Sequence, residues 1–67
     1  MKLTKNGYFL ITIRKTITLH LWSEDKEFLL NEAKEEPKKK YQVVESFKDE
    51  STGYEYILVD GKYIKLG

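Results

Sequence analysis

Cysteine is absent from this chain of 67 residues, and proline occurs only once. Without cysteine the protein has no disulfides, no thiolate nucleophiles and no sulfur ligands for zinc, a usage that suits an intracellular protein. Stability then has to come from packing, in a chain near the lower size limit at which a hydrophobic core suffices. We expect one compact domain over residues 1–67.

Long hydrophobic runs are also missing, since no run is longer than Tyr8 to Ile11, which is far too short to cross a membrane. The N-terminus lacks the apolar segment of a signal peptide. These features predict a cytoplasmic protein with no membrane partner. Lysine and glutamate are abundant while asparagine and glutamine are scarce, a usage typical of thermophile proteins.

A strong charge of one sign is absent as well, because 12 Lys and Arg nearly balance 11 Asp and Glu, for a net charge of +1. Such a balance gives no overall attraction to nucleic acid, so binding to phosphates requires local segregation of charge. Acidic residues crowd the segment 24–36, whereas cations gather near both termini, at Arg14-Lys15 and in the segment 38–40. The sequence therefore predicts an electrostatically polarised molecule.

The segment from Tyr8 to Trp22 alternates between apolar and mostly polar residues, which is the period of a half-buried β-strand. Its odd positions are predicted to face the core: Phe9, Ile11, Ile13, Ile17, Leu19 and Leu21. A three-residue loop, Arg14-Lys15-Thr16, would pair Ile13 with Ile17, Ile11 with Leu19, and Phe9 with Leu21. The alternative is one continuous, strongly bent strand.

Asn6-Gly7 is a signal for a type I′ hairpin turn, and it predicts a short first strand, Lys2 to Lys5, before the strand that begins at Tyr8. Ser23 is a suitable N-cap and Pro37 cannot continue a helix, so a helix is expected from Glu24 to about Glu36. Leu29, Leu30 and Ala33 share the side of this helix that would cover the sheet.

Three further strands are predicted at 41–48, 54–59 and 62–66, with Asp60-Gly61 as a second type I′ turn. The expected fold is α+β, a small antiparallel sheet of five to six strands with one helix packed on it, in the order β-β-β-α-β-β-β. In the last hairpin, Ile57, Val59 and Ile64 should share a face with Val43 and Phe47. The opposite face then carries Tyr54, Tyr56, Leu58, Tyr63 and Lys65.

Aromatic rings beside cations suit both single-stranded nucleic acid and the hot spots of protein interfaces. The candidate interaction residues are therefore Tyr54, Tyr56, Tyr63 and Lys65, together with Phe28, which does not fit the apolar stripe of the helix. A purely structural use is the alternative, because tyrosine is favoured in strands. Leu10 and Leu58 belong to the same alternation as the tyrosines and are candidates for burial between two copies.

Lys38, Lys39 and Lys40 follow Pro37 and could contact phosphates. The alternative is a solvated linker that balances the helix carboxylates and the negative C-terminal end of the helix.

His20 is the only histidine, and neither a nucleophile motif nor a His/Asp set accompanies it. We therefore predict no enzyme activity, no cofactor and no metal.

These observations predict a small non-enzymatic binding module that engages a protein partner or itself as a homodimer. The alternative is a nucleic-acid-binding protein that uses the Lys cluster 38–40 with Tyr56 and Tyr63. Near-neutral net charge favours the protein partner, since strong nucleic-acid binders of this size carry a clear positive excess. The glycine-flanked aromatic motifs of nucleic-acid-binding barrels are missing, and no family resemblance was found.

Overall fold

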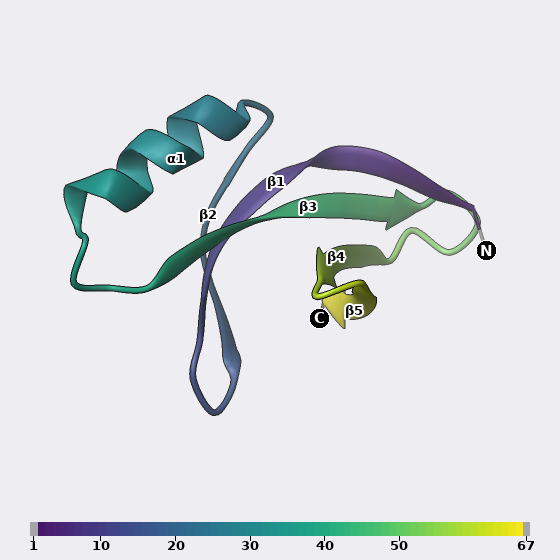
Figure 1. Cartoon of the computed structure of the whole chain (residues 1–67). Coiled ribbons are helices and arrows are strands. Elements are labelled where there is room, and N and C mark those ends of the chain that lie inside the picture. Colours follow the sequence, from purple (N-terminus) through teal and green to yellow (C-terminus); the bar gives the residue numbers. More distant parts are fainter. Residues whose placement is uncertain (1, 67) are drawn as a thin grey trace.

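A computed structural model describes residues 2–66 and has one antiparallel sheet of five strands with a single helix packed on it (Figure 1). The spatial order of the strands is β2-β1-β3-β4-β5, which places β1 between β2 and β3. The predicted α+β class is confirmed, with two strands before the helix instead of three. The elements are β1 (Leu3–Ile13), β2 (Ile17–Ser23), α1 (Lys26–Glu35), β3 (Tyr41–Asp49), β4 (Glu55–Val59) and β5 (Lys62–Leu66).

The hairpin turn predicted at Asn6-Gly7 is wrong, because β1 runs through this dipeptide without reversing. Gly7 has a φ of 114°, and the register between β1 and β3 shifts between Lys5 and Gly7, which makes Asn6 a bulge. The chain passes close to β2 here: a Cβ on Gly7 would lie 2.9 Å from both the Ser23 carbonyl oxygen and the Trp22 ring. The positive φ of Gly7 thus permits a bend within a long strand. The dipeptide Asn-Gly by itself does not distinguish such a bend from a hairpin turn.

The loop Arg14-Lys15-Thr16 does join β1 to β2, and the predicted pairs Ile13 with Ile17 and Ile11 with Leu19 are confirmed. The pair Phe9 with Leu21 is wrong. His20 is an extra residue in β2, so Leu10 lies opposite Leu21 and Phe9 opposite Trp22. The extra residue moves Leu21 off the predicted core face, and Leu21 is 37% exposed. Leu10 keeps the face that alternation predicts for it, and it is only 4% exposed because the helix covers that face. Leu10 is therefore not available for burial between two copies.

The helix is two residues shorter at its start than predicted. Its N-cap is Asp25, whose carboxylate accepts a hydrogen bond from the Glu27 N–H at 3.0 Å, while Ser23 Oγ accepts one from the Asp25 N–H. Leu29 is fully buried, and the helix packs on β1, β2 and β3. Leu10 and its cross-strand neighbour Val43 lie on the outer sheet face, the one that the helix covers.

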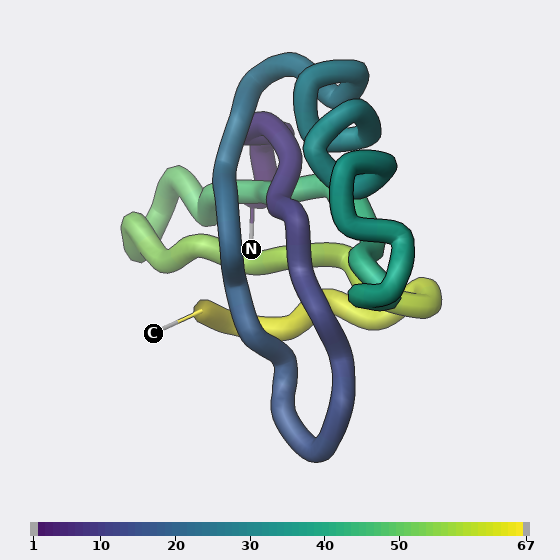
Figure 2. The backbone as a smooth tube through the Cα atoms, turned by 90° about the vertical axis from the view of Figure 1, so that its left-hand side faces the viewer, coloured from purple at the N-terminus to yellow at the C-terminus, as the bar shows by residue number. Residues whose placement is uncertain are grey.

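The main core lies on the other, inner face of the sheet. The sheet bends so strongly that the β1–β2 hairpin crosses over β4 and β5 (Figure 2). Ile11, Val44, Ile57 and Val59 are buried between them. Val43 and Phe47 do not share this face, contrary to the prediction, because Ser46 pairs with Ile57 and thereby turns the even-numbered residues of β3 inward.

Both ends of β4 are fixed by turns. Asp60 and Gly61 have φ values of 50° and 76°, and the predicted pairing of β4 with β5 is confirmed from Val59–Lys62 to Tyr56–Lys65. Before β4, Asp49 accepts two hydrogen bonds on Oδ1, from the backbone N–H and from the hydroxyl of Ser51. These turns set the register that positions the outward-facing side chains of β4 and β5.

Candidate nucleic-acid interface

The outer face of β3, β4 and β5 lies beyond the helix and carries two rows of cross-strand neighbours. In the first row, Lys5 lies opposite Phe47, Phe47 opposite Tyr56, and Tyr56 opposite Lys65. The second row is formed by the same kind of cross-strand neighbours, in the order Tyr8, Glu45, Leu58 and Tyr63. The first row therefore runs from a lysine, across two aromatic rings, to a second lysine.

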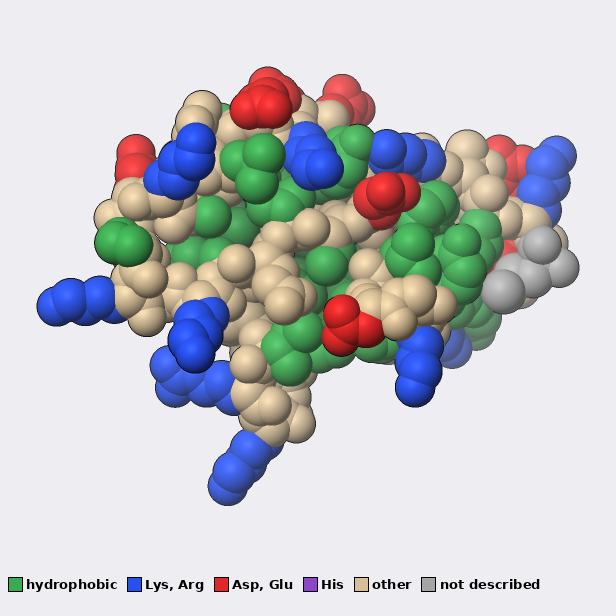
Figure 3. Space-filling model, viewed as in Figure 1, with side chains coloured by type: hydrophobic (Ala, Val, Ile, Leu, Met, Phe, Trp, Pro, Cys, Tyr) green, Lys and Arg blue, Asp and Glu red, His purple; other side chains and the backbone are tan. Residues whose placement is uncertain are grey.

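We use the term aromatic platform for the rings and lysines of this face: Tyr8, Phe47, Tyr54, Tyr56, Tyr63, Lys5 and Lys65. Tyr54 and Tyr63 are 48% and 50% exposed, and the other three rings are half-buried. In Figure 3, hydrophobic side chains lie beneath the helix and also, outside the helix, on the right-hand side, where β1 starts and β3 ends.

The rings and cations of the platform contact each other directly. The rings of Phe47 and Tyr63 meet edge to face with centroids 5.5 Å apart, and Lys65 Nζ lies 3.8 Å from the centroid of Tyr54. Lys5 Nζ lies 4.5 Å from the centroid of Tyr8 and donates a hydrogen bond to its hydroxyl. That hydrogen bond is the main cause that raises the pKa of Lys5 above its usual value. Each of the two ammonium groups thus lies over the face of an aromatic ring, the geometry of a cation–π contact.

The structure brings together four of the residues singled out from the sequence: Tyr54, Tyr56, Tyr63 and Lys65. It adds Tyr8, Phe47 and Lys5, which sequence reasoning missed. Phe47 was missed because β3 was placed one residue out of register, and Lys5 because Asn6-Gly7 was taken for a turn. The alternation of Val43, Glu45 and Phe47 was the available signal, since a glutamate in the series indicates a face open to solvent.

Phe28 is 45% exposed on α1, and it belongs to neither row of the platform.

A second surface forms where the linker after α1 approaches the β1–β2 turn. Here a hollow of about 490 Å³, which we call the cationic groove, is lined by Thr12, Ile13, Arg14, Thr18, His20, Lys38, Lys39 and Lys40. In Figure 3, Lys and Arg side chains project at the lower left, around this turn and linker, with no acidic side chain among them in that view. The predicted segregation of positive charge at the linker is therefore present in the fold.

The floor of the cationic groove is ordered by hydrogen bonds and ring contacts. His20 Nε2 lies 2.8 Å from the Thr12 hydroxyl, and its ring meets that of Tyr41 edge to face at 5.1 Å. Lys39 Nζ lies 3.2 Å from a carboxylate oxygen of Glu36. This contact is the main cause that raises the pKa of Lys39. The sequence placed His20 on the face of Thr18, and the groove brings both to the same surface.

No protein-family model, no curated protein and no solved structure matches this chain. Within residues 2–66, no helix combines the length and apolar composition needed to span a lipid bilayer. In the same part of the chain, His, Asp and Glu side chains form no cluster of three or more that could hold a metal ion.

Proposed function

We propose that this protein is a non-enzymatic module that binds single-stranded nucleic acid on the aromatic platform. The observation that carries the proposal is the row Lys5, Phe47, Tyr56, Lys65, which crosses four strands of the sheet. Aromatic rings offer surfaces on which unpaired bases stack, and flanking cations contact the phosphates between them. An antiparallel sheet holds these groups at fixed spacings, so little ordering is needed on binding.

A single strand fits the platform better than a duplex does. In a duplex the base faces are stacked on each other and cannot reach rings that lie on a sheet. The small net charge of +1 also favours stacking as the main source of affinity, because duplex binding relies on neutralising many phosphates. The near-neutral charge that favoured a protein partner is thus compatible with a ligand that is bound largely through its bases.

The direct test is fluorescence anisotropy with labelled single-stranded DNA, single-stranded RNA and a duplex of the same sequence. We expect single strands to bind more tightly than the duplex. Tyr63→Ala should lose about 1–3 kcal/mol of binding free energy, and Tyr63→Phe should keep most of it. Phe28→Ala is the matched control, because it removes a ring of similar exposure from α1. Equal losses from Tyr63→Ala and Phe28→Ala would refute the platform as the binding surface.

The two platform lysines should act through phosphates. Replacing Lys65 with Gln should reduce the slope of log affinity against log salt by about one unit at most. Lys62→Gln is the control on the same strand, since Lys62 lies opposite Val59 and outside both rows. An unchanged salt slope in Lys65→Gln would show that this lysine contacts no phosphate.

A second candidate function, self-association, is favoured by the edge strand β2. The sequence of β2, Ile17–Ser23, contains no Lys, Arg, Asp or Glu, and Leu19 and Trp22 are each 41% exposed. The other edge strand, β5, carries Lys62 and Lys65, which discourage edge-to-edge pairing. In a twofold pairing of β2 with β2 of a second copy, no like charges would meet.

Light scattering should then give a dimer that Leu19→Lys converts to a monomer. A monomeric wild-type protein at high micromolar concentration would refute self-association through β2.

A further inference from the structure

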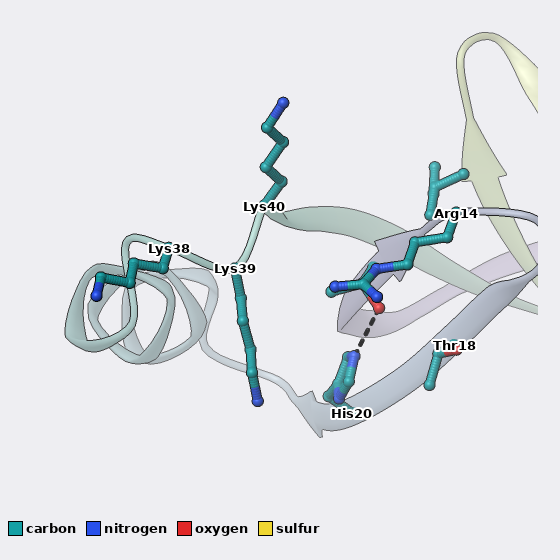
Figure 4. Close-up of a pocket in the computed structure, with 8 residues that line it drawn as sticks. Arg14, Thr18, His20, Lys38, Lys39 and Lys40 are labelled. Atoms are coloured by element: carbon teal, nitrogen blue, oxygen red, sulfur yellow. Dashed lines mark hydrogen bonds between the residues drawn. The ribbon is translucent and has the colours of Figure 1, made fainter.

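The cationic groove lies apart from the aromatic platform, because the helix covers the outer sheet face between them. Arg14 reaches it from the β1–β2 turn and the lysines reach it from the linker after α1. Figure 4 shows Arg14 and Lys39 flanking His20, while Lys38 and Lys40 point away at the rim. Two segments that are distant in sequence thus supply cations to one hollow.

Neutralisation of the helix carboxylates does not explain why these cations gather at the groove. If that were their role, the linker lysines would pair with the acidic residues of α1. Lys39 does so, through Glu36. Among residues 2–66, however, Arg14, Lys38 and Lys40 form no salt bridge. No Asp or Glu lines the groove, and Glu36 is the one carboxylate paired with any of its cations among residues 2–66.

The polar groups of the groove are mostly hydrogen-bond donors to an oxyanion. The Arg14 guanidinium can donate two parallel hydrogen bonds to one phosphate, and lysine ammonium groups act as mobile point charges around it. The Thr18 hydroxyl adds a short, neutral donor, while the Thr12 hydroxyl is engaged with the His20 ring. A hollow of about 490 Å³ falls in the size range of small-molecule sites and has room for more than one phosphate group.

We propose that the cationic groove is a binding site for a short run of linked phosphates, independent of the aromatic platform. This chemistry is present in a free polyphosphate and in the backbone of a nucleic acid. His20 and Thr12 form the ordered floor, and Arg14 and Lys39 hold the central phosphate, for which Lys39 exchanges its contact with Glu36. Lys38 and Lys40 turn inward from the rim to contact the neighbouring phosphates.

The test is an NMR titration of the ¹⁵N-labelled protein with sodium tripolyphosphate and, separately, with a short single-stranded oligonucleotide. We expect saturable shifts of the backbone amides of Thr12, Arg14, Thr18, His20 and residues 38–40. Arg14→Gln and Lys40→Gln should each weaken binding about fivefold. Lys2→Gln, at an exposed cation paired with Glu50 far along the sheet, is the control and should leave binding unchanged.

The outcomes separate the two phosphate sources and the two proposals. Saturation by tripolyphosphate identifies a polyphosphate site, and saturation by the oligonucleotide alone identifies a backbone site. Sodium sulfate at equal ionic strength should give weak, unsaturated shifts. Equal shifts with sulfate, or no saturable shift with either phosphate compound, would overturn the inference. Tyr63→Ala should not alter tripolyphosphate binding. The titration therefore tests the cationic groove even if the aromatic platform does not bind nucleic acid.

Discussion

Ser46 is the polar side chain that fits its surroundings least well. It is completely buried on the inner face of β3, and its hydroxyl has no hydrogen-bond partner among residues 2–66. A buried hydroxyl without a partner costs free energy because it has lost its hydrogen bonds to water. Its neighbours across the strands, Gly7 and Ile57, offer no side-chain acceptor.

We expect Ser46→Ala to raise the free energy of unfolding by about 1 kcal/mol in urea titrations, since the unsatisfied group is removed. Ser51→Ala is the contrasting variant. The Ser51 hydroxyl donates to Asp49 at 2.6 Å, and its loss should lower stability. A destabilised Ser46→Ala would show that the hydroxyl is satisfied in solution.

Glycines with positive φ differ in the space around them. A Cβ on Gly7 would lie 2.9 Å from backbone and ring atoms of β2, whereas a Cβ on Gly61 would meet nothing within 4 Å. Gly61→Ala should therefore cost only the backbone strain of a left-handed residue, about 1–2 kcal/mol. Gly7→Ala should cost more, because β2 must also move. Thermal denaturation that gives equal losses would contradict the close approach of the two strands.

Asp49 makes stability depend on pH. Hydrogen bonds from the Ser51 hydroxyl, and then from the Ser51 N–H, lower the pKa of this carboxyl from its usual 3.8. Because the pKa is lower in the folded protein, the carboxylate stabilises the fold above pH 3.8, and this contribution is lost as the pH falls further. Asp49→Asn should show a smaller loss of stability than wild type between pH 5 and pH 2. A constant difference between the two proteins over that range would contradict this prediction.

At the scale of elements, alternation located the strands from Tyr8 onward, because a period of two is a local property of the chain. The turn signal at Asn6-Gly7, however, divided β1 into two predicted strands. The three-residue loop at Arg14-Lys15-Thr16 also followed from local register. The two bulges, at Asn6 and His20, could not be predicted, because each depends on what the partner strand does. The bulge at His20 explains why Leu21, expected in the core, is 37% exposed, whereas Leu10, expected between two copies, is instead buried by the helix of its own chain.

The edge position of β2 gives a stability prediction for two residues that lie opposite each other, because it leaves Leu19, which was expected in the core, open to solvent. Ile11 is fully buried in the main core, whereas Leu19 is 41% exposed on the edge strand. Ile11→Ala should lower the free energy of unfolding by about 2–5 kcal/mol. Leu19→Ala should lower it far less, because its side chain leaves no closed cavity. Similar losses in denaturant titrations would mean that β2 is covered in solution.

At the scale of the whole molecule, the candidate surfaces were only partly visible in the sequence. The Tyr and Lys residues of β4 and β5 could be grouped, because one tight turn joins the two strands and fixes their pairing. Lys5 and Tyr8 could not be added, since the pairing of β1 with β3 spans the helix. Phe47 was missed because β3 was expected one residue out of register with β4. Arg14 and the lysine linker are likewise separated by β2 and the helix, so no short-range sequence pattern indicated that they line one groove.

The central position of β1 has a consequence for how the chain reaches this fold. Ile11 comes from before the helix, and Val44, Ile57 and Val59 come from after it, yet they form one core. Neither half can exclude water from its apolar face alone, so β1 must pair with β3 across a closed loop that contains the helix. Two synthetic peptides, residues 2–37 and 38–66, should each be unfolded by circular dichroism and should recover strand signal when mixed. If either peptide folds by itself, the chain is not one cooperative unit but an assembly of two.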